Sequence, residues 1–133
     1  MQKRVLILCT GNSCRSIIGE ALINRYLDGI KAYSAGVRAS GKVNKNAKKV
    51  LEVDGSWSDD YCSKTVEEII DIKFDLVVTV CDNAKESCPI FPHDIEVIHV
   101  GFKDPDGKEF FEFEKSLKLI KDELLPVVKD KLS

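Results

Sequence analysis

The sequence lacks the features that mark membrane proteins, nucleic-acid-binding proteins and repeat proteins. No apolar run exceeds a few residues, whereas a membrane-spanning helix needs about 20. Lysine and arginine number 20 and the acidic residues 22, so the net charge of −2 provides no basic excess for contacting phosphate backbones. Internal repeats, low-complexity tracts and linkers are also missing. These absences predict a protein that binds neither nucleic acid nor membranes.

The composition is that of an ordinary globular domain. Apolar residues make up 44% of the 133 residues and charged residues 32%, a balance typical of folded rather than disordered chains. A chain of this length builds one sizeable core but not two, so we expect a single domain over residues 1–133. Residues 1–8 have too short an apolar stretch for a secretory signal, and no small-residue cleavage site follows. We interpret this stretch as a strand and expect a cytoplasmic protein that acts as a monomer.

The cysteines are too few and too oddly spaced for a disulfide scaffold or a zinc site. There are five of them: Cys9, Cys14, Cys62, Cys81 and Cys88. In a reducing compartment, cysteines in such a chain are catalytic, metal-binding or buried rather than paired for stability. The spacings Cys9-x4-Cys14 and Cys81-x6-Cys88 do not match the short knuckles of structural zinc sites. We therefore expect no required metal and look for catalytic thiols.

Short apolar runs alternate with amphipathic segments along the chain. The apolar runs predict strands at residues 5–9, 30–35, 75–80 and 96–100. Helical spacing predicts helices at 16–27, 46–53, 65–72 and 112–132, the last interrupted or tightened near Pro126. This order argues for an α/β domain of three layers, a four-stranded parallel sheet with helices on both faces. Sites in such sheets form at the carboxyl ends of strands, so Cys9, Cys81 and the loop after Val100 should lie at one edge.

Residues 9–16, Cys-Thr-Gly-Asn-Ser-Cys-Arg-Ser, leave a predicted strand and enter a predicted helix. Backbone N–H groups in such a turn can hold a tetrahedral oxyanion, and the planar guanidinium of Arg15 suits its oxygens. Cys9 stands at the base of the loop, where the helix N-terminus and Arg15 favour the thiolate, so we predict that it is the nucleophile. The predicted oxyanion-binding residues are Thr10, Gly11, Asn12, Ser13, Cys14, Arg15 and Ser16. A nucleotide-binding P-loop is excluded, because no Gly-Lys-Ser/Thr follows.

This loop resembles that of the low-molecular-weight protein tyrosine phosphatases and of the arsenate reductases that share their fold. The resemblance continues through residues 33–36 (Tyr-Ser-Ala-Gly), 75–79 (Asp-Leu-Val-Val-Thr) and 101–105 (Gly-Phe-Lys-Asp-Pro). It implies the fold of that family and a general acid in an Asp-Pro loop, a position that Asp104 matches.

The two activities of this fold differ in what resolves the intermediate. Both begin with attack of a thiolate on a tetrahedral oxyanion, but a phosphatase then uses water and a reductase a second thiol. The segment from Cys81 to Cys88, followed by proline, resembles the redox pair of thioredoxin-coupled arsenate reductases. Residues 104–107, Asp-Pro-Asp-Gly, lack the aromatic side chains that the phosphatases carry there. The resemblance favours the reductase. A phosphatase acting on phosphomonoesters is the alternative, and a noncatalytic oxyanion-binding module is a third hypothesis.

The resemblance to the reductases implies a relay of three cysteines that detoxifies arsenate. Cys9 attacks arsenate while Asp104 protonates the departing hydroxyl. Cys81 then attacks the adduct, arsenite leaves and a Cys9–Cys81 disulfide forms. Cys88 moves the disulfide to Cys81–Cys88, which thioredoxin reduces. No bound cofactor is implied.

Some reductases of this family bind potassium beside the anion loop. Three of its ligands are matched by Asn12, Glu20 and Ser34. The fourth, an acid, should fall near Ser63 or Lys64, and neither is acidic. A Lys64 ammonium could substitute for the cation, so we expect no potassium requirement. Cys14 is expected to be structural, and Cys62 has no matched role.

Overall fold

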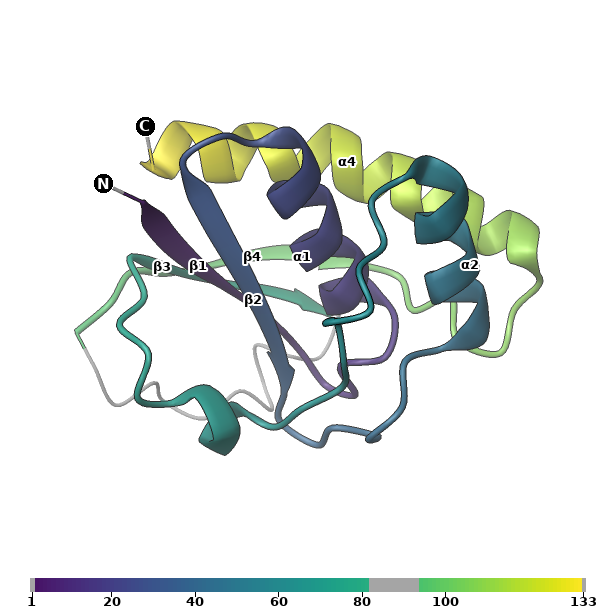
Figure 1. Ribbon diagram of the computed structural model, residues 1–133, viewed down its shortest axis with the longest axis horizontal. Coiled ribbons are helices and arrows are strands. Elements are labelled where there is room, and N and C mark those ends of the chain that lie inside the picture. Colours follow the sequence, from purple (N-terminus) through teal and green to yellow (C-terminus); the bar gives the residue numbers. More distant parts are fainter. Residues whose placement is uncertain (1, 82–93, 133) are drawn as a thin grey trace.

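A parallel sheet forms the centre of the molecule (Figure 1). The computed structural model describes residues 2–81 and 94–132. Its four strands are β1 (Lys3–Cys9), β2 (Ile30–Gly36), β3 (Leu76–Cys81) and β4 (Val97–Phe102). They lie in the order β2-β1-β3-β4, and every neighbouring pair is parallel. The predicted four-stranded parallel sheet is confirmed.

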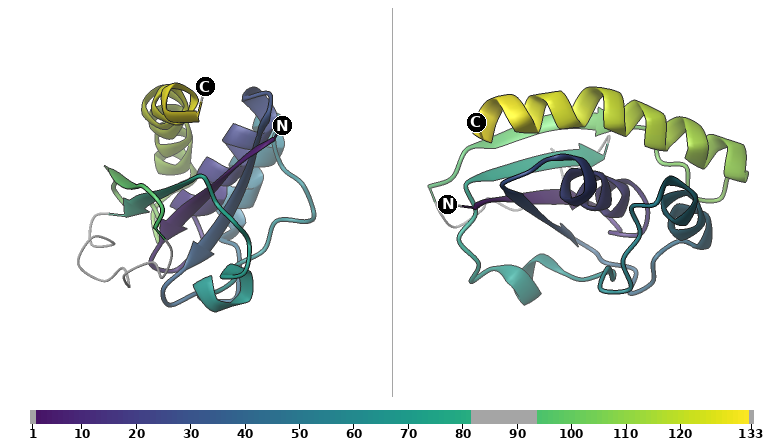
Figure 2. Two further views of the ribbon diagram at one scale, coloured as in Figure 1. Left: turned by 90° about the vertical axis from the view of Figure 1, so that its left-hand side faces the viewer. Right: turned by 45° about the horizontal axis from the view of Figure 1, so that its top comes forward.

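Helices cover the two faces of the sheet unequally. Within residues 2–81 and 94–132, the three α-helices are α1 (Arg15–Tyr26), α2 (Lys45–Asp54) and α4 (Phe110–Leu132). Figures 1 and 2 show all three on one face, while the short 3-10 helix η1 (Val66–Ile69) lies against the other. Two separate apolar clusters follow from this arrangement. One joins Val5 and Ile7 to the α-helices, and the other joins Leu6 and Leu8 to η1.

Strand β1 is apolar throughout because it is buried on both faces. Residues 5–8 have no solvent exposure, and alternate side chains enter the two clusters. Such a strand reads as a continuous apolar run rather than an alternating one. This burial holds the carboxyl end of β1, where Cys9 lies, in a fixed position.

Two expectations about helices were wrong in detail. Residues 65–72 form only the short η1, although Thr65 and Glu68 make the expected capping box. Helix α4 is not interrupted at Pro126 but continues through it. Pro126 and Asp122, the residue whose carbonyl loses its helical partner, are both exposed, so water can replace the missing hydrogen bond.

The carboxyl ends of three adjacent strands share one edge, as predicted. Cys9 ends β1, Cys81 ends β3 beside Phe102, and Phe102 ends β4. Because β1, β3 and β4 are neighbours in the sheet, the loops that follow them face a common region. Across the described ranges, no helix is long and apolar enough to cross a membrane.

Candidate active site

The sulfur of Cys9 lies at the centre of the loop between β1 and α1, residues 9–16, here called the anion loop. The backbone N–H of Asn12 donates to Cys9 Sγ at 3.2 Å, and Ser16 Oγ lies 2.8 Å from the same sulfur. Asn12 Nδ2 donates to Ser16 Oγ at 2.7 Å, which leaves the hydroxyl hydrogen of Ser16 free to point at the sulfur. Hydrogen bonds of this kind stabilise a negatively charged sulfur. The geometry therefore suits Cys9 as a thiolate nucleophile.

Asn12 connects the anion loop to the rest of the fold. Its backbone is left-handed, with φ of 48°, a conformation that asparagine tolerates better than most residues. Its buried side chain uses Nδ2 for Ser16, and Oδ1 accepts the backbone N–H of Lys64 at 2.8 Å. Lys64 in turn accepts the N–H of Gly36, at the end of β2, at 2.9 Å. The loop is thereby held from β2 as well as from β1.

The backbone of the anion loop is also fixed by the segment that follows β2. Four carbonyl groups of the loop, those of residues 9, 10, 11 and 13, accept N–H groups from residues 37, 38, 40 and 44 at 2.9 to 3.1 Å. At the start of α1, the N-cap residue Cys14 makes no side-chain capping bond to the helix. The first N–H groups of a helix have no partner within it, and such ends attract anions. The loop is therefore a rigid candidate site for an oxyanion.

Arg15 joins the anion loop to the loop after β4. Its Nη1 donates to the carbonyl oxygen of Phe102 at 3.1 Å, and its Nη2 lies 3.4 Å from Asp104 Oδ2. The side chain is only 9% exposed, and its buried Nε has no hydrogen-bond partner in the described structure. Buried donors are rarely left unpaired, because the lost hydration is costly. The Nε of Arg15 therefore remains available to donate to an acceptor such as an oxyanion.

Asp104 lies where an acid could reach a ligand in the anion loop. Its side chain is 49% exposed, and Oδ1 accepts the backbone N–H of Asp106 at 3.0 Å, which closes a turn around the buried Pro105. The ion pair with Arg15 keeps the carboxyl beside the guanidinium. The structure thus brings Arg15 and Asp104 into contact beside the loop that holds Cys9, so three of the five residues predicted to be catalytic lie at one site.

Two residues of this site, Asn44 and Asp106, were missed from the sequence. Asn44 Nδ2 donates to Asp106 Oδ1 at 2.6 Å, and Cys14 Sγ lies 3.9 Å from the same oxygen. The only sequence signal was the position of Asn44 before an amphipathic run, where asparagine caps a helix. Burial raises the pKa of Cys14 to about 12, so its thiol stays protonated and can donate to Asp106. This agrees with a structural rather than a nucleophilic Cys14.

In the described structure, the side chains of the candidate potassium ligands are engaged in hydrogen bonds. Ser34 Oγ donates to Glu20 Oε1 at 2.6 Å, and Asn12 Oδ1 is already bonded to Lys64 N–H. Burial raises the pKa of Glu20 to about 7, opposed first by the charge of Lys64, then by the hydrogen bond from Ser34 and by the charge of Lys31. Positive charge at Glu20 is thus supplied by lysines. Among the residues with described positions, no group of three or more His, Cys, Asp or Glu could hold a metal ion.

Of the two remaining predicted redox thiols, Cys81 lies at the end of the described part of β3 and Cys88 does not lie among the described residues. The backbone of Cys81 ends β3 at the same edge as Cys9. Cys62 is an exposed free cysteine.

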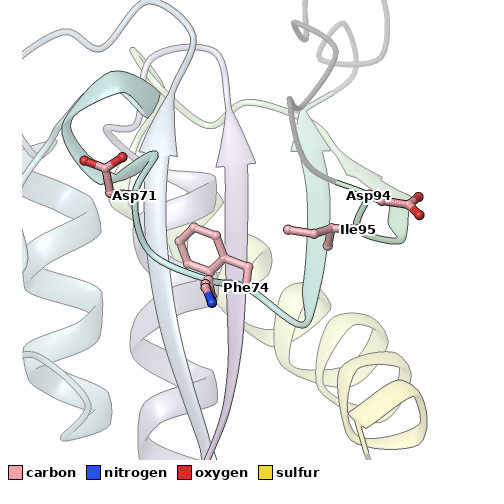
Figure 3. A pocket seen from close by; sticks show the side chains of 5 residues that line it. Asp71, Phe74, Asp94 and Ile95 are labelled. Atoms are coloured by element: carbon pink, nitrogen blue, oxygen red, sulfur yellow. The ribbon is translucent and has the colours of Figure 1, made fainter.

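A separate pocket lies on the face of the sheet that η1 covers (Figure 3). Phe74 and Ile95 form its apolar lining, and Asp71 and Asp94 stand at its sides. Phe74 and Ile95 precede β3 and β4 respectively, so the pocket borders the amino ends of these strands. It is therefore distinct from the edge that carries Cys9.

The amino-acid sequence is similar to one protein family over nearly its whole length. The family model for low molecular weight phosphotyrosine protein phosphatase matches residues 4–130. An arsenate reductase of Bacillus cereus (strain AH187) is 41% identical over 124 residues, covering 92% of this chain and 89% of that protein. An arsenate reductase of Brevibacillus brevis is 40% identical over 124 residues, which again cover 92% of this chain and 89% of that protein.

Solved structures agree with this result. The crystal structure of arsenate reductase from Archaeoglobus fulgidus superposes with a TM-score of 0.82 at 33% identity, covering 93% of this chain and 98% of the other. A low molecular weight protein tyrosine phosphatase from T. tengcongensis also gives 0.82, at 26% identity, covering 98% of this chain and 100% of the other. The chain therefore belongs to the low molecular weight phosphotyrosine protein phosphatase family, and the relatives named above from both Bacillus and Brevibacillus are arsenate reductases.

Proposed function

We propose that this protein reduces arsenate to arsenite, with Cys9 as the nucleophile. The observation that carries the proposal is the convergence of Cys9, Arg15 and Asp104 at one edge of the sheet, with the buried Nε of Arg15 unpaired. A tetrahedral oxyanion bound by the loop and by Arg15 lies directly in front of the sulfur. The similarity to arsenate reductases at about 40% identity supports arsenate as that oxyanion.

The first step joins sulfur to arsenic. The thiolate of Cys9 displaces one hydroxyl of arsenate and forms an S–As(V) bond, and Asp104 protonates the departing oxygen, which leaves as water. The N–H groups of the anion loop and Arg15 stabilise the charge on the remaining oxygens. Arsenic is not yet reduced at this stage.

The second step transfers the electrons. The thiolate of Cys81 attacks the sulfur of Cys9, the S–As bond breaks and its electron pair passes to arsenic, which leaves as As(III) in arsenite. The product on the protein is a Cys9–Cys81 disulfide. The position of Cys81 at the end of β3, the strand next to β1, supports this role.

The third step returns Cys9 to its reduced form. Cys88 attacks the sulfur of Cys81, releases the Cys9 thiolate and leaves a Cys81–Cys88 disulfide. We propose thioredoxin as the external dithiol that reduces this disulfide, with no bound cofactor and no metal involved. The resemblance of the Cys81-x6-Cys88-Pro segment to the redox pair of thioredoxin-coupled enzymes supports this choice.

A coupled assay tests the proposal. We expect arsenate to cause NADPH oxidation in the presence of the protein, thioredoxin and thioredoxin reductase, and omission of thioredoxin to stop it. Cys9→Ser should abolish turnover, whereas the matched thiol variant Cys62→Ser should behave as the wild type. The same catalytic groups would also serve a phosphatase. If the protein hydrolyses phosphotyrosine but arsenate causes no NADPH oxidation, the proposed arsenate reduction is wrong and the protein is a phosphatase.

A further inference from the structure

The loop that carries Asp104, residues 103–107, is attached to the rest of the site through Asp106. The backbone N–H of Asp106 donates to Asp104 Oδ1, and the carboxyl of Asp106 accepts from Asn44 Nδ2 at 2.6 Å. Asp106 is therefore bonded on one side to the candidate acid and on the other to a residue 62 positions earlier in the chain. Any displacement of Asp106 also displaces the atom that holds Asp104.

Asn44 is itself fixed by further hydrogen bonds, one of them from the backbone N–H of Lys48 to its carbonyl oxygen at 3.0 Å. The backbone N–H of Asn44 donates to the carbonyl of Ser13 in the anion loop at 3.0 Å. Its Oδ1 caps α2 by accepting the N–H groups of Asn46 at 2.8 Å and Ala47 at 3.2 Å. Because these N–H groups require an oxygen, the side-chain amide can have only one orientation, and that orientation turns Nδ2 toward Asp106. One side chain thus connects the anion loop, α2 and the loop of Asp104.

The contacts of Asp104 itself are few. In the described structure its carboxyl has the ion pair with Arg15 at 3.4 Å and the hydrogen bond from Asp106 N–H, and about half of the side chain is exposed. A partly exposed ion pair contributes little to fixing a loop. The hydrogen bond of Asn44 to a carboxylate is short and charge-assisted, and the protonated thiol of Cys14 approaches the same oxygen. Asp106 is therefore the residue through which this loop is bonded to Asn44 and approached by Cys14.

We propose that Asn44 is a positioning residue that holds the Asp104 loop over the anion loop through its hydrogen bond to Asp106. This inference rests on the proposed function, since it assumes that Asp104 acts as an acid on an oxyanion bound beside Cys9. Asn44 contacts neither Cys9 nor the side chain of Arg15 in the described structure. Its effect should therefore fall on the chemical step and not on oxyanion binding.

The variant Asn44→Asp separates the two functions of this side chain. Aspartate keeps an oxygen for the N-cap of α2, where it is as favourable as asparagine, but it replaces the donor to Asp106 with a second carboxylate. We expect the single-turnover rate of arsenite formation to fall about tenfold or more, because the acid is no longer held in place. The inhibition constant of inorganic phosphate and the midpoint of thermal unfolding should stay within about twofold and 2 °C of the wild type, since a cap is retained.

Two matched variants control for charge and for the helix. Asn46→Asp makes the same chemical change two residues later, where the described contact is only a backbone N–H, and should leave the rate unchanged. Asp106→Asn keeps an oxygen that can accept from Asn44 but removes the charge on the acceptor, so its rate should lie between that of the wild type and that of N44D. The double variant N44D/D106N exchanges donor and acceptor, and we expect it to recover most of the rate lost in N44D.

The outcomes distinguish this inference from the function on which it rests. A normal rate for N44D, or a double variant as slow as N44D, would overturn the positioning role while Asp104→Asn remains slow. A loss of thermal stability in N44D that accounts for the lower rate, with weaker phosphate binding, would also overturn it in favour of a purely structural role. If the wild type forms no arsenite at all, the proposed function fails first, and the positioning role falls with it.

Discussion

The two loops that face each other across the site are built in different ways. The anion loop between β1 and α1 is buried, and its side chains and carbonyl groups bond to β2, to Lys64 and to the segment after β2. The loop between β4 and α4 is largely exposed and is attached through Arg15, Asn44 and the buried Pro105. The first is held by many backbone contacts and the second by a few side chains.

This difference separates binding from proton transfer. A rigid ring of donors stabilises developing charge without having to reorganise during the reaction, which is what an oxyanion site needs. An acid must only be within hydrogen-bond reach of the leaving oxygen, and it can be held by a loop with fewer contacts. Substitutions in the anion loop should therefore impair binding and chemistry together, whereas those in the Asp104 loop should impair chemistry alone.

The largest selective effect is expected at Asp104. Asp104→Asn removes the proton donor but keeps the size of the side chain, so the rate of Cys9 adduct formation should fall by ~10²–10⁴-fold. Phosphate affinity should change much less, because Asp104 is half-exposed and lies outside the ring of anion-loop donors that would bind phosphate. Rapid-quench measurement of adduct formation, with phosphate inhibition measured in parallel, checks both. An unchanged adduct rate would reduce Asp104 to a turn residue.

Arg15 lies in the anion loop and contacts the Asp104 loop. Its replacement should therefore impair both oxyanion binding and the chemical step. Arg15→Lys keeps a positive charge but loses the planar fork that contacts Phe102 and Asp104. We expect kcat/KM for arsenate to fall by ~10²–10³-fold, the range found when one oxyanion donor is removed, and phosphate affinity to fall as well. Steady-state kinetics and phosphate inhibition measure the two effects. Retention of phosphate affinity would show that Arg15 does not bind the oxyanion.

A pair of glycines tests the rigidity of the two loops. A Cβ added to Gly36 would lie 2.6 Å from Thr10 O and 3.0 Å from Asn12, whereas one added to Gly107 meets nothing within 4 Å. Gly36→Ala should therefore cost ~1–3 kcal/mol of unfolding free energy and weaken phosphate binding. Gly107→Ala should cost only ~1–2 kcal/mol, from its φ of 81°, and leave phosphate binding intact. Denaturant titrations and phosphate inhibition separate the pair, and equal losses of phosphate affinity would contradict the contrast.

The smallest expected effect concerns two thiols that take no part in the proposed chemistry. Burial raises the pKa of Cys14 to about 12, above its ordinary value of 9.0, so the folded protein keeps this thiol protonated until the pH approaches 12. Cys14 should resist iodoacetamide at pH 8, while the exposed Cys62 is alkylated. Peptide mapping after brief treatment of the native protein gives the result. Alkylation of both at similar rates would mean that the anion loop opens readily.

The sequence was sufficient for the parts of the fold that depend on local pattern. Buried parallel strands are continuous apolar runs, so the sheet was predictable, and the motif from Cys9 to Arg15 carries its own turn geometry. Contacts between distant loops were not predictable. The bond from Asn44 to Asp106 depends on how two loops meet after the sheet has formed, and no local pattern encodes this. Pro126 was misjudged because only the three-dimensional structure shows which side of α4 faces solvent.

The most direct test of the account is to identify the disulfide that forms in the Cys88→Ser variant after one equivalent of arsenate. Without Cys88 the relay should stop after its second step. The account therefore predicts one arsenite released per protein and a Cys9–Cys81 disulfide, seen by mass spectrometry of peptides prepared without reduction. The same treatment of a protein that also carries Cys9→Ser should give neither product. Release of arsenite with Cys9 left reduced, or repeated turnover of Cys88→Ser with thioredoxin, would contradict the proposed relay.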